Sequence, residues 1–221
     1  MKNIAVIGLS SFGFYLCKSL STLGFNLMAV EIKEDLVNQV KPYVRKAVIG
    51  DAKDKNFLMK LGITDFDTVI ISVGSKIDVS ILITLYMKEL NIKEIVAKAI
   101  NDDHAKILEK IGATRIIFPE RDLASRMAYT IAAPNFLEYI PLTEGFSLIE
   151  IAPAKEWIGK KLNELMLRNK YKIQIAMIRE IIPERVVIPD GNFVLKDSDI
   201  LYIIGSDQNI MSLEKDVSKD N

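Results

Sequence analysis

A glycine-containing turn near the amino terminus has the residue types and spacing of a phosphate-binding loop. Residues 8–13 read GLSSFG, between an apolar run and a stretch with helical periodicity. This is the dinucleotide-binding pattern G-x-G-x-x-G with serine at the middle glycine, whose glycines allow a tight turn, close approach to phosphate and close helix packing. Free amides at the start of the helix attract the phosphate. Ser10 adds a side chain where the phosphate comes closest, and its hydroxyl could donate a hydrogen bond.

Glu31 is the second candidate for ligand chemistry. It ends an apolar run and lies 18 residues after Gly13, close to the ~20 residues expected for the carboxylate that holds a ribose. Two plainer interpretations stay open. Gly8 and Gly13 could serve only packing in a protein that binds nothing, and Glu31 could be a solvated strand end. The order of strand, turn and helix favours a nucleotide site.

The other reactive residue types do not form a catalytic set. The single cysteine, Cys17, excludes an intramolecular disulfide and a cysteine-based zinc site, and its place in the first expected helix favours a small core residue. The single histidine, His104, follows residues 101–103 (NDD) in a pattern typical of a helix start. Nothing recurs around it at metal-ligand spacing. We therefore expect no enzyme chemistry.

The first part of the chain must position these residues, and it alternates strand-like runs with helical patterns. The expected strands are Ile4–Gly8, Leu27–Glu31, Ala47–Ile49, Thr68–Val73, Ile95–Ala99 and Arg115–Phe118. Most are apolar throughout, as in parallel strands covered on both faces. Amphipathic stretches such as 80–90 and 103–111 lie between them. The alternation predicts an α/β fold with a doubly wound parallel sheet, the Rossmann-like arrangement.

A second, smaller α+β domain is expected after Pro134 and Pro141 break this pattern, and the predicted division is 1–135 and 136–215. Strands are expected at Ser147–Ile151, Ile173–Arg179, Val186–Ile188 and Ile200–Ile204, with a short helix at Gly159–Leu167. The tail after Leu213 is charged and expected to fray. This unit is too small and too poor in catalytic residues for a typical substrate domain.

The composition excludes several classes of protein. The 221 residues include 29 lysines and arginines and 29 aspartates and glutamates, so the formal net charge is zero, whereas nucleic-acid-binding proteins usually have a basic face. Apolar residues make up 49%, which is too many for a disordered chain. No apolar run approaches the ~20 residues of a membrane-spanning helix.

The amino terminus and the hydropathy suggest where the protein is and how it assembles. The first residues run directly into a strand without the apolar region of a signal peptide, so we expect a cytoplasmic protein. The mean hydropathy of +0.19 favours extensive subunit contacts. Two apolar stretches, 77–85 and 124–131, are either ordinary core or such contacts.

Seven short motifs occur in a specific order. They are the turn at 8–13, Ala29-Val30-Glu31, Gly50-Asp51-Ala52, Ile70–Gly74, Ala97-Lys98-Ala99, residues 108–113 (LEKIGA) and Phe118-Pro119-Glu120. This set resembles the RCK domains, the regulators of potassium conductance, and in particular the cytosolic subunits of Ktr/Trk-type potassium uptake systems. The resemblance extends over nearly the whole chain, and the small domain is similar to the family's carboxy-terminal lobe.

The resemblance implies that the first domain binds an adenine nucleotide, ATP or ADP. The implied contacts are Gly8, Ser10, Ser11, Phe12 and Gly13 for the phosphates, Glu31 for the ribose, Asp51 and Ala52 for the adenine, with Val73, Gly74, Lys98 and Glu120 completing the site. Relatives usually have an arginine at the position of Ser11 that reaches a neighbouring subunit's terminal phosphate, and that contact is missing here. Glu120 matches an acidic position that could hold a divalent cation between subunits. Taken alone, a glutamate after proline is commonly a helix N-terminal charge.

The small domain resembles lobes that bind cyclic di-AMP at their dimer interface. The matching positions are Leu162, Arg168, Gln174, Ile175 and Pro189. Arg168 could pair with phosphate, and the apolar residues offer a wall for adenine. The alternative is that Leu162 and Ile175 are simply core and Arg168 is a surface charge.

The function implied is that of a non-catalytic regulatory subunit. In the family, such chains form dimers in an octameric ring that docks under a potassium channel in the membrane, and ATP or ADP sets the shape of the ring. Two alternatives stay open: an NAD(H)-dependent oxidoreductase, because the fold does not fix function, and a free-standing cyclic-dinucleotide sensor. The sequence offers no set of lysine, histidine and tyrosine for hydride and proton transfer, which favours the regulatory subunit.

Overall fold

The computed structural model describes residues 2–133 and 135–217, and the chain divides into two compact units, residues 1–119 and 120–221. Each unit is described by itself. The helix α6 (Pro119–Ala132) starts at this division. The functional boundary predicted at residue 135 stays a prediction, and the break expected at Pro134 lies outside the described residues.

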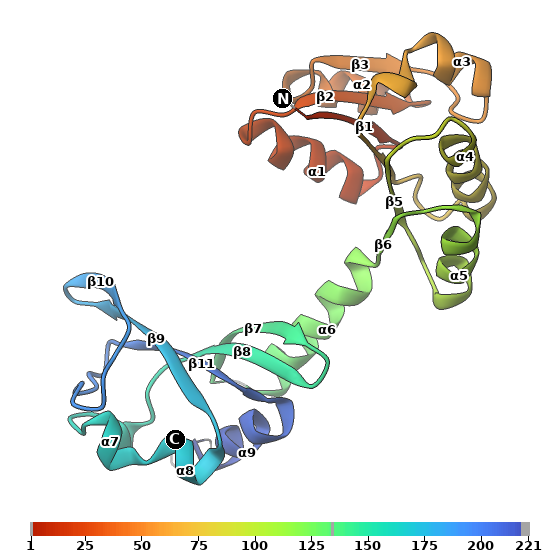
Figure 1. The fold of residues 1–221 in the computed structure, drawn as a ribbon. Coiled ribbons are helices and arrows are strands. Elements are labelled where there is room, and N and C mark those ends of the chain that lie inside the picture. The colour runs from red at the N-terminus through yellow and green to blue at the C-terminus, as the bar shows by residue number, and fades with distance from the viewer. Residues whose placement is uncertain (1, 134, 218–221) are drawn as a thin grey trace. The chain divides into compact units, whose positions relative to one another are not determined.

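The first unit contains a six-stranded parallel sheet in the order β3-β2-β1-β4-β5-β6 (Figure 1). The strands are β1 (Asn3–Ile7), β2 (Asn26–Glu31), β3 (Lys46–Ile49), β4 (Thr68–Ile71), β5 (Glu94–Lys98) and β6 (Arg115–Ile117). The helices are α1 (Ser11–Thr22), α2 (Glu34–Val40), α3 (Lys55–Lys60), α4 (Ile77–Glu89) and α5 (Asp102–Ile111), with short 3-10 turns at Lys41–Tyr43 and Ile63–Asp65. The chain winds outward from β1 in both directions, so the predicted doubly wound parallel sheet is confirmed.

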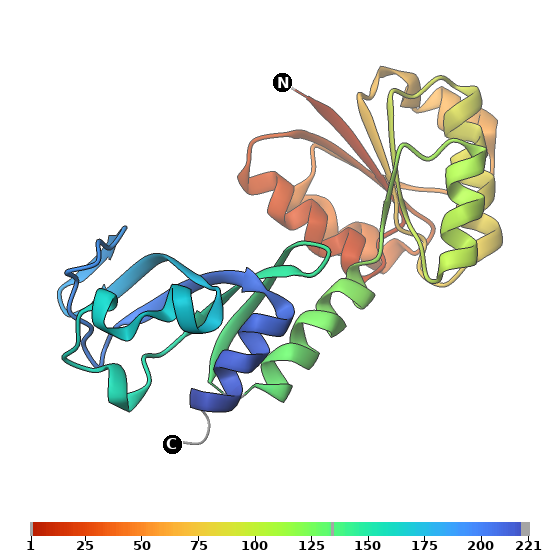
Figure 2. The same cartoon turned by 60° about the horizontal axis from the view of Figure 1, so that its bottom comes forward.

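Side chains of one strand alternate between two cores, one on each face of this sheet. In β1, Ala5 and Ile7 pack in the core that α3, α4 and α5 cover. Ile4 and Val6 pack in the core that α1 and α2 cover. Because successive side chains point to opposite faces, an apolar strand requires helices on both sides, as Figure 2 shows. Cys17 lies in the second core, and burial raises the pKa of its thiol to about 12, so the predicted core role is confirmed.

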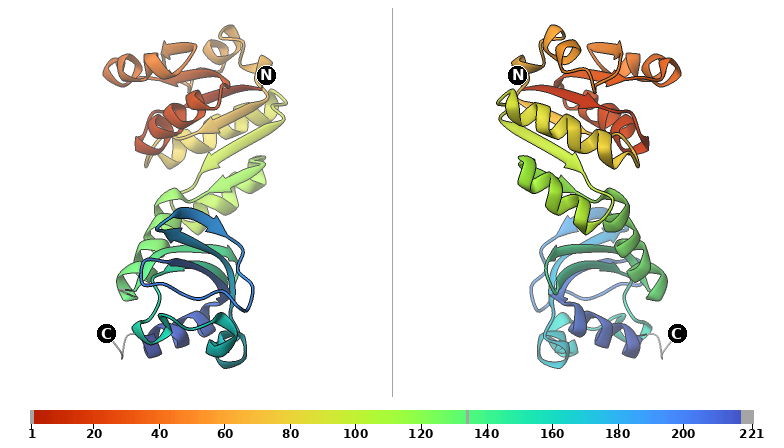
Figure 3. Two further views of the ribbon diagram at one scale, coloured as in Figure 1. Left: turned by 90° about the vertical axis from the view of Figure 1, so that its left-hand side faces the viewer. Right: turned by 90° about the vertical axis from the view of Figure 1, so that its right-hand side faces the viewer.

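The second unit contains a five-stranded antiparallel sheet in the order β10-β9-β11-β8-β7 (Figure 3). The strands are β7 (Phe136–Thr143), β8 (Phe146–Ile151), β9 (Gln174–Ile181), β10 (Glu184–Val187) and β11 (Ile200–Ser206). The other helices are α7 (Leu162–Leu165), α8 (Leu167–Tyr171) and α9 (Asp207–Val217), with a 3-10 turn at Lys155–Trp157. The helix α9 packs against β8 and β11, and Trp157 and Ile203 are part of one core. The predicted α+β class of the smaller domain is confirmed.

Two local predictions for this unit are wrong, and one strand was missed. No single helix covers 159–167, because Gly159 and Met166 have left-handed φ angles of 77° and 47° and interrupt the helical segments. The pattern changes before Pro141 as expected, but the strand around this proline was not predicted: Pro141 lies in β7, an edge strand, where the missing N–H of proline is tolerated. The chain does not fray directly after Leu213, because α9 continues to Val217 and both of these side chains are buried; the rest of the tail, residues 218–221, lies outside the described residues.

Within the described part of the chain, no helix has the length and apolar character to cross a membrane.

Candidate functional site: a cavity at the carboxyl ends of β1, β2 and β4

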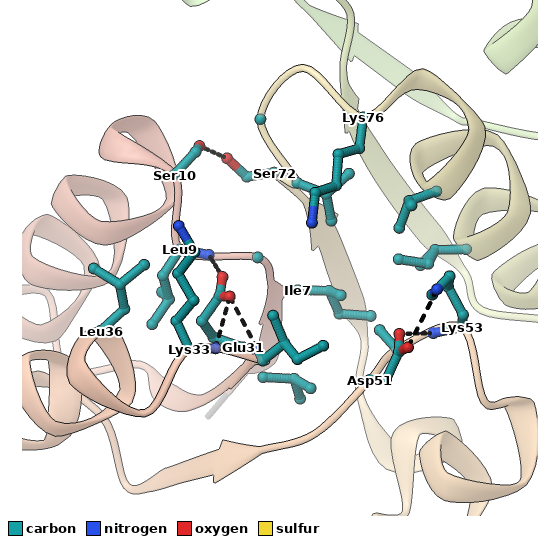
Figure 4. A pocket seen from close by; sticks show the side chains of 18 of the residues that line it. Ile7, Leu9, Ser10, Glu31, Lys33, Leu36, Asp51, Lys53, Ser72 and Lys76 are labelled. Atoms are coloured by element: carbon teal, nitrogen blue, oxygen red, sulfur yellow. Dashed lines mark hydrogen bonds and ion pairs between the residues drawn. The ribbon is translucent and has the colours of Figure 1, made fainter.

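A cavity of about 540 Å³ in the first unit lies where β1, β2 and β4 end (Figure 4). Volumes of this order are typical of small-ligand sites. In the sheet order, β2 and β4 flank β1. The strands β1 to β3 run outward on one side of β1, and β4 to β6 run outward on the other side, so the strand order reverses at β1. Ligands of open α/β sheets bind at this topological switch point, outside the carboxyl ends of the strands.

The two glycines of the turn are required by the backbone. Gly8 has a φ of 87°, and a Cβ there would lie 2.6 Å from the carbonyl oxygen of Ser72. A Cβ on Gly13 would collide with the carbonyl oxygen of Gly8. Gly8 therefore allows β1 and β4 to come close at the turn, and Gly13 allows α1 to pack against β1, as the motif predicts.

Ser10 stands at the start of α1, where its hydroxyl contacts another hydroxyl. The Oγ atoms of Ser10 and Ser72 are 2.6 Å apart. Ser10 is the N-cap residue of α1, but its side chain makes no capping hydrogen bond. Since no described side chain caps this helix end and its first turn has no acidic residue, the arrangement favours an anionic ligand there.

Glu31 lies on the cavity wall in a defined orientation. Its Oε2 accepts a hydrogen bond of 2.8 Å from the backbone N–H of Leu9. Its Oε1 accepts from the N–H groups of Ile32 (2.9 Å) and Lys33 (3.1 Å). The carboxylate is therefore not a freely solvated strand end, and it connects the end of β2 to the turn after β1. Of the about four acceptor sites of a carboxylate, these three donors leave one, on Oε2, for a further donor such as a ribose hydroxyl.

Asp51 and Ala52 form the far side of the same cavity. Asp51 accepts a hydrogen bond of 2.9 Å from the N–H of Lys53 and lies 3.4 Å from the Lys53 Nζ. Ala52 is buried in the core beneath α3 and α4. This end offers a carboxylate beside an apolar surface.

The structure brings most of the predicted residues of the first unit together. Those that line the cavity are Gly8, Ser10, Glu31, Asp51, Ala52, Val73 and Gly74. Ser11, Phe12 and Gly13 form the adjacent first turn of α1, and Lys98, which is 8% exposed, ends β5; none of these four lines the cavity. Glu120 lies in the first turn of α6 in the second unit. The ligand roles of all these residues stay predictions.

Several polar residues of the wall were not predicted from the sequence. They are Lys33, Lys53, Ser72, Ser75, Lys76 and Asp78. All follow the ends of β2, β3 or β4 within a few residues. Because the carboxyl ends of parallel strands meet at one edge, the strand ends themselves were the signal that could have found them.

The second unit has a cavity of about 340 Å³ lined by all five residues predicted for cyclic di-AMP: Leu162, Arg168, Gln174, Ile175 and Pro189. They come from α7, α8, the start of β9 and the segment after β10. Ile175 is 9% exposed and Leu162 packs against the same core, so these two residues have a core role as well as a place on the wall. The ligand itself stays a prediction.

His104 is buried inside the first unit and has no place in either cavity. Neither ring nitrogen has a hydrogen-bond partner among the described residues, and burial lowers the pKa of the imidazole below its usual value. The described residues contain no cluster of three or more histidine, cysteine or acidic side chains that could hold a metal ion.

The doubly wound sheet, its switch-point cavity and the separate antiparallel lobe define a class: two-domain proteins with a Rossmann-like amino-terminal domain and a small α+β carboxy-terminal domain. Residues 4–119 match the TrkA-N domain and residues 146–218 match the TrkA-C domain. The chain belongs to the family of TrkA-N/TrkA-C proteins, the RCK-domain proteins of potassium transport, so the predicted resemblance is confirmed.

The similar proteins include Ktr subunits over nearly their full lengths. The chain is 44% identical to Ktr system potassium uptake protein C of Bacillus subtilis, covering 98% of this chain and 97% of that protein. It is 38% identical to Ktr system potassium uptake protein A of the same organism, with 97% and 96% covered. Both relatives are named as potassium uptake proteins, and the expectation of a non-enzymatic chain agrees with this relationship.

Among solved structures, the GsuK RCK domain has the same fold. The TM-score is 0.65 at 18% identity, and the match covers 97% of this chain and 47% of that chain. At this identity the match supports the fold alone.

Proposed function

We propose that this chain is the regulatory subunit of a potassium uptake system and that it binds ATP or ADP in the cavity at the ends of β1, β2 and β4. The assignment of this ligand rests on the placement of Glu31 beside the start of α1, which no described side chain caps. A carboxylate for ribose hydroxyls and a helix start for phosphate stand on one cavity wall. Asp51 and Ala52 offer the adenine an acceptor and an apolar surface.

The proposed mechanism is a shift between conformations. A nucleotide changes the equilibrium only by its different affinities for the two states. Copies of the chain form dimers in an octameric ring on the cytoplasmic face of a membrane potassium transporter, and the shape of the ring gates transport. The ring and the divalent cation proposed at Glu120 come from the family resemblance; light scattering with and without Mg²⁺ tests both.

The nucleotide proposal is tested by titration calorimetry of the full chain with ATP, ADP and NADH. We expect ATP and ADP to bind, and Glu31→Gln to weaken both by about tenfold, the effect of losing a charge-assisted hydrogen bond. Glu34→Gln is the matched control, because Glu34 is exposed and lies outside the cavity. Binding of NADH alone, or equal affinities in all three proteins, would contradict the assignment.

The transport proposal is tested with the membrane subunit of a Ktr-type potassium uptake system, reconstituted in liposomes. Addition of the chain should change the rate of potassium flux, and exchange of ADP for ATP should change it again. A flux that is independent of the chain would refute the regulatory role, while nucleotide binding could still hold.

We also propose that the second unit, within residues 136–215, is a ligand-sensing and dimerisation lobe that takes cyclic di-AMP. The specific support is that all five candidate residues surround one cavity. Arg168→Gln should abolish thermal stabilisation by cyclic di-AMP, because a bound ligand stabilises the native state by mass action. Lys155→Gln, an exposed change outside this cavity, should keep it. Equal stabilisation of both variants would remove Arg168 from the site.

A further inference from the structure

Two lysines reach the nucleotide cavity from opposite sides of β1. Lys33 follows the end of β2 by two residues, and Lys76 follows the end of β4 by five. β2 and β4 are the two neighbours of β1, so the lysines flank the turn at 8–10 that begins where β1 ends. Both lysines line the cavity.

The side chains point into this space rather than away from it. Figure 4 shows Lys76 extending from the segment before α4 toward the middle of the cavity, and Lys33 running beside Glu31 toward the turn. The backbone N–H of Lys33 donates to Glu31, which fixes the start of that side chain relative to the ribose candidate. Phosphates that extend from the start of α1 into the cavity would therefore have an ammonium group on each side, whereas the single phosphate of AMP would stay at the helix start.

Other charged side chains of the wall have partners within the protein, but these two lysines form no ion pair with the described residues. Lys53 lies 3.4 Å from Asp51, and three backbone amides satisfy Glu31. By contrast, neither Lys33 nor Lys76 forms an ion pair with any residue of the described ranges. The remaining carboxylate, Asp78, belongs to the first turn of α4. The cavity thus holds two lysines available to a multiply charged ligand.

We propose that Lys33 and Lys76 act together as a clamp, within one subunit, for the terminal phosphates of a nucleoside di- or triphosphate. This inference deepens the proposed function and rests on it. A terminal phosphate carries nearly two negative charges near neutral pH, whereas the two phosphates of a dinucleotide such as NADH are diesters with one charge each. The lysines therefore make affinity rise with the number of phosphates, and they determine specificity without touching the base or the ribose.

The experiment is titration calorimetry of the full chain with AMP, ADP, ATP and NADH, using Lys33→Gln, Lys76→Gln and the double variant. Lys60→Gln is the control, because Lys60 is exposed in α3 and lies outside the cavity. Each single change should lower the affinity for ATP by about tenfold, which corresponds to about 1.4 kcal/mol. The affinities for AMP and NADH should change by no more than about twofold. Added salt should weaken ATP binding more in the unaltered chain than in the double variant, because screening acts on these charges.

The outcomes separate this inference from the proposed function. If ATP and ADP bind the unaltered chain and the lysine changes weaken AMP as much as ATP, or weaken neither, the clamp is wrong and the nucleotide site stands. If neither ATP nor ADP binds the unaltered chain, both the clamp and the proposed ligand are overturned.

Discussion

The carboxylate of Glu31 is oriented by the protein itself. Three backbone N–H groups, from the turn after β1 and from the end of β2, donate to its two oxygens. A ligand hydroxyl that meets an oriented acceptor loses less freedom on binding than one that must order it. At the residue scale, the spacing in the sequence pointed to a side chain that lies on the cavity wall, and the fold shows why its position is fixed; its contact with a ribose stays a prediction.

His104 gives a residue-scale prediction on pH. Burial lowers the pKa of its imidazole in the folded protein, so the unfolded chain binds the proton more readily. The stability that this difference provides is complete above the unfolded pKa of ~6.5 and is lost as the pH falls toward the folded pKa. Urea unfolding at pH 7.5 and pH 5.5 should show a loss of stability at the lower pH that is smaller in His104→Leu. An equal loss in both proteins would contradict this assignment.

The packing of α1 on β1 gives a prediction at the scale of elements. Gly13→Val should abolish stabilisation by ATP and ADP, because its side chain would collide with the Gly8 carbonyl and displace α1 from the turn. The second unit should remain folded, which thermal unfolding followed by the fluorescence of its buried Trp157 can show. Ser19→Val, on an exposed position of α1, is the control. Unchanged ATP and ADP shifts in Gly13→Val would refute the role of this turn.

The helix α9 gives a second prediction at this scale. Leu213 is fully buried in the core of the second unit. Leu213→Ala should cost about 2–5 kcal/mol of the free energy of unfolding, since it removes buried methyl groups and leaves a cavity. Ser212→Ala, on the exposed side of α9, should stay within about 0.5 kcal/mol. Urea unfolding measures both, and a loss in Leu213→Ala no larger than in its neighbour would indicate a frayed helix end.

At the scale of the whole molecule, one of the two apolar stretches belongs to the core and the other lies on an exposed helix. The stretch 77–85 lies in α4, which contributes Ile83 and Met87 to the core. The stretch 124–131 lies in α6, which has no buried residue. Leu123, Met127 and Ile131 are 57%, 55% and 75% exposed and recur every four residues, so they share one helix face.

This face predicts self-association. An exposed apolar stripe of this kind favours a protein contact, so the chain should be larger than a monomer in light scattering. Met127→Glu should shift the distribution toward smaller species, because it places a charge in the contact. Ser125→Glu, which adds the same charge elsewhere on α6, should not. A monomeric unaltered chain would contradict the prediction.

The sequence by itself determined the doubly wound sheet, because short runs that are apolar throughout, helical patterns between them and glycine turns are local patterns. It determined the turn and Glu31 for the same reason, and the family resemblance added Asp51 and the five residues of the second cavity. It did not determine α9 or the broken helix after Gly159, because burial of Val217 and the left-handed angle of Met166 depend on the surrounding core.

Only the tertiary structure decided which strand ends meet. Lys33 and Lys76 are 43 residues apart in the sequence and carry no motif, so nothing local connects them. They line one cavity because β2 and β4 pair with opposite sides of β1. Local periodicity is encoded in neighbouring residues, whereas the convergence of charges on a ligand depends on sheet order, which is set by packing over the whole domain.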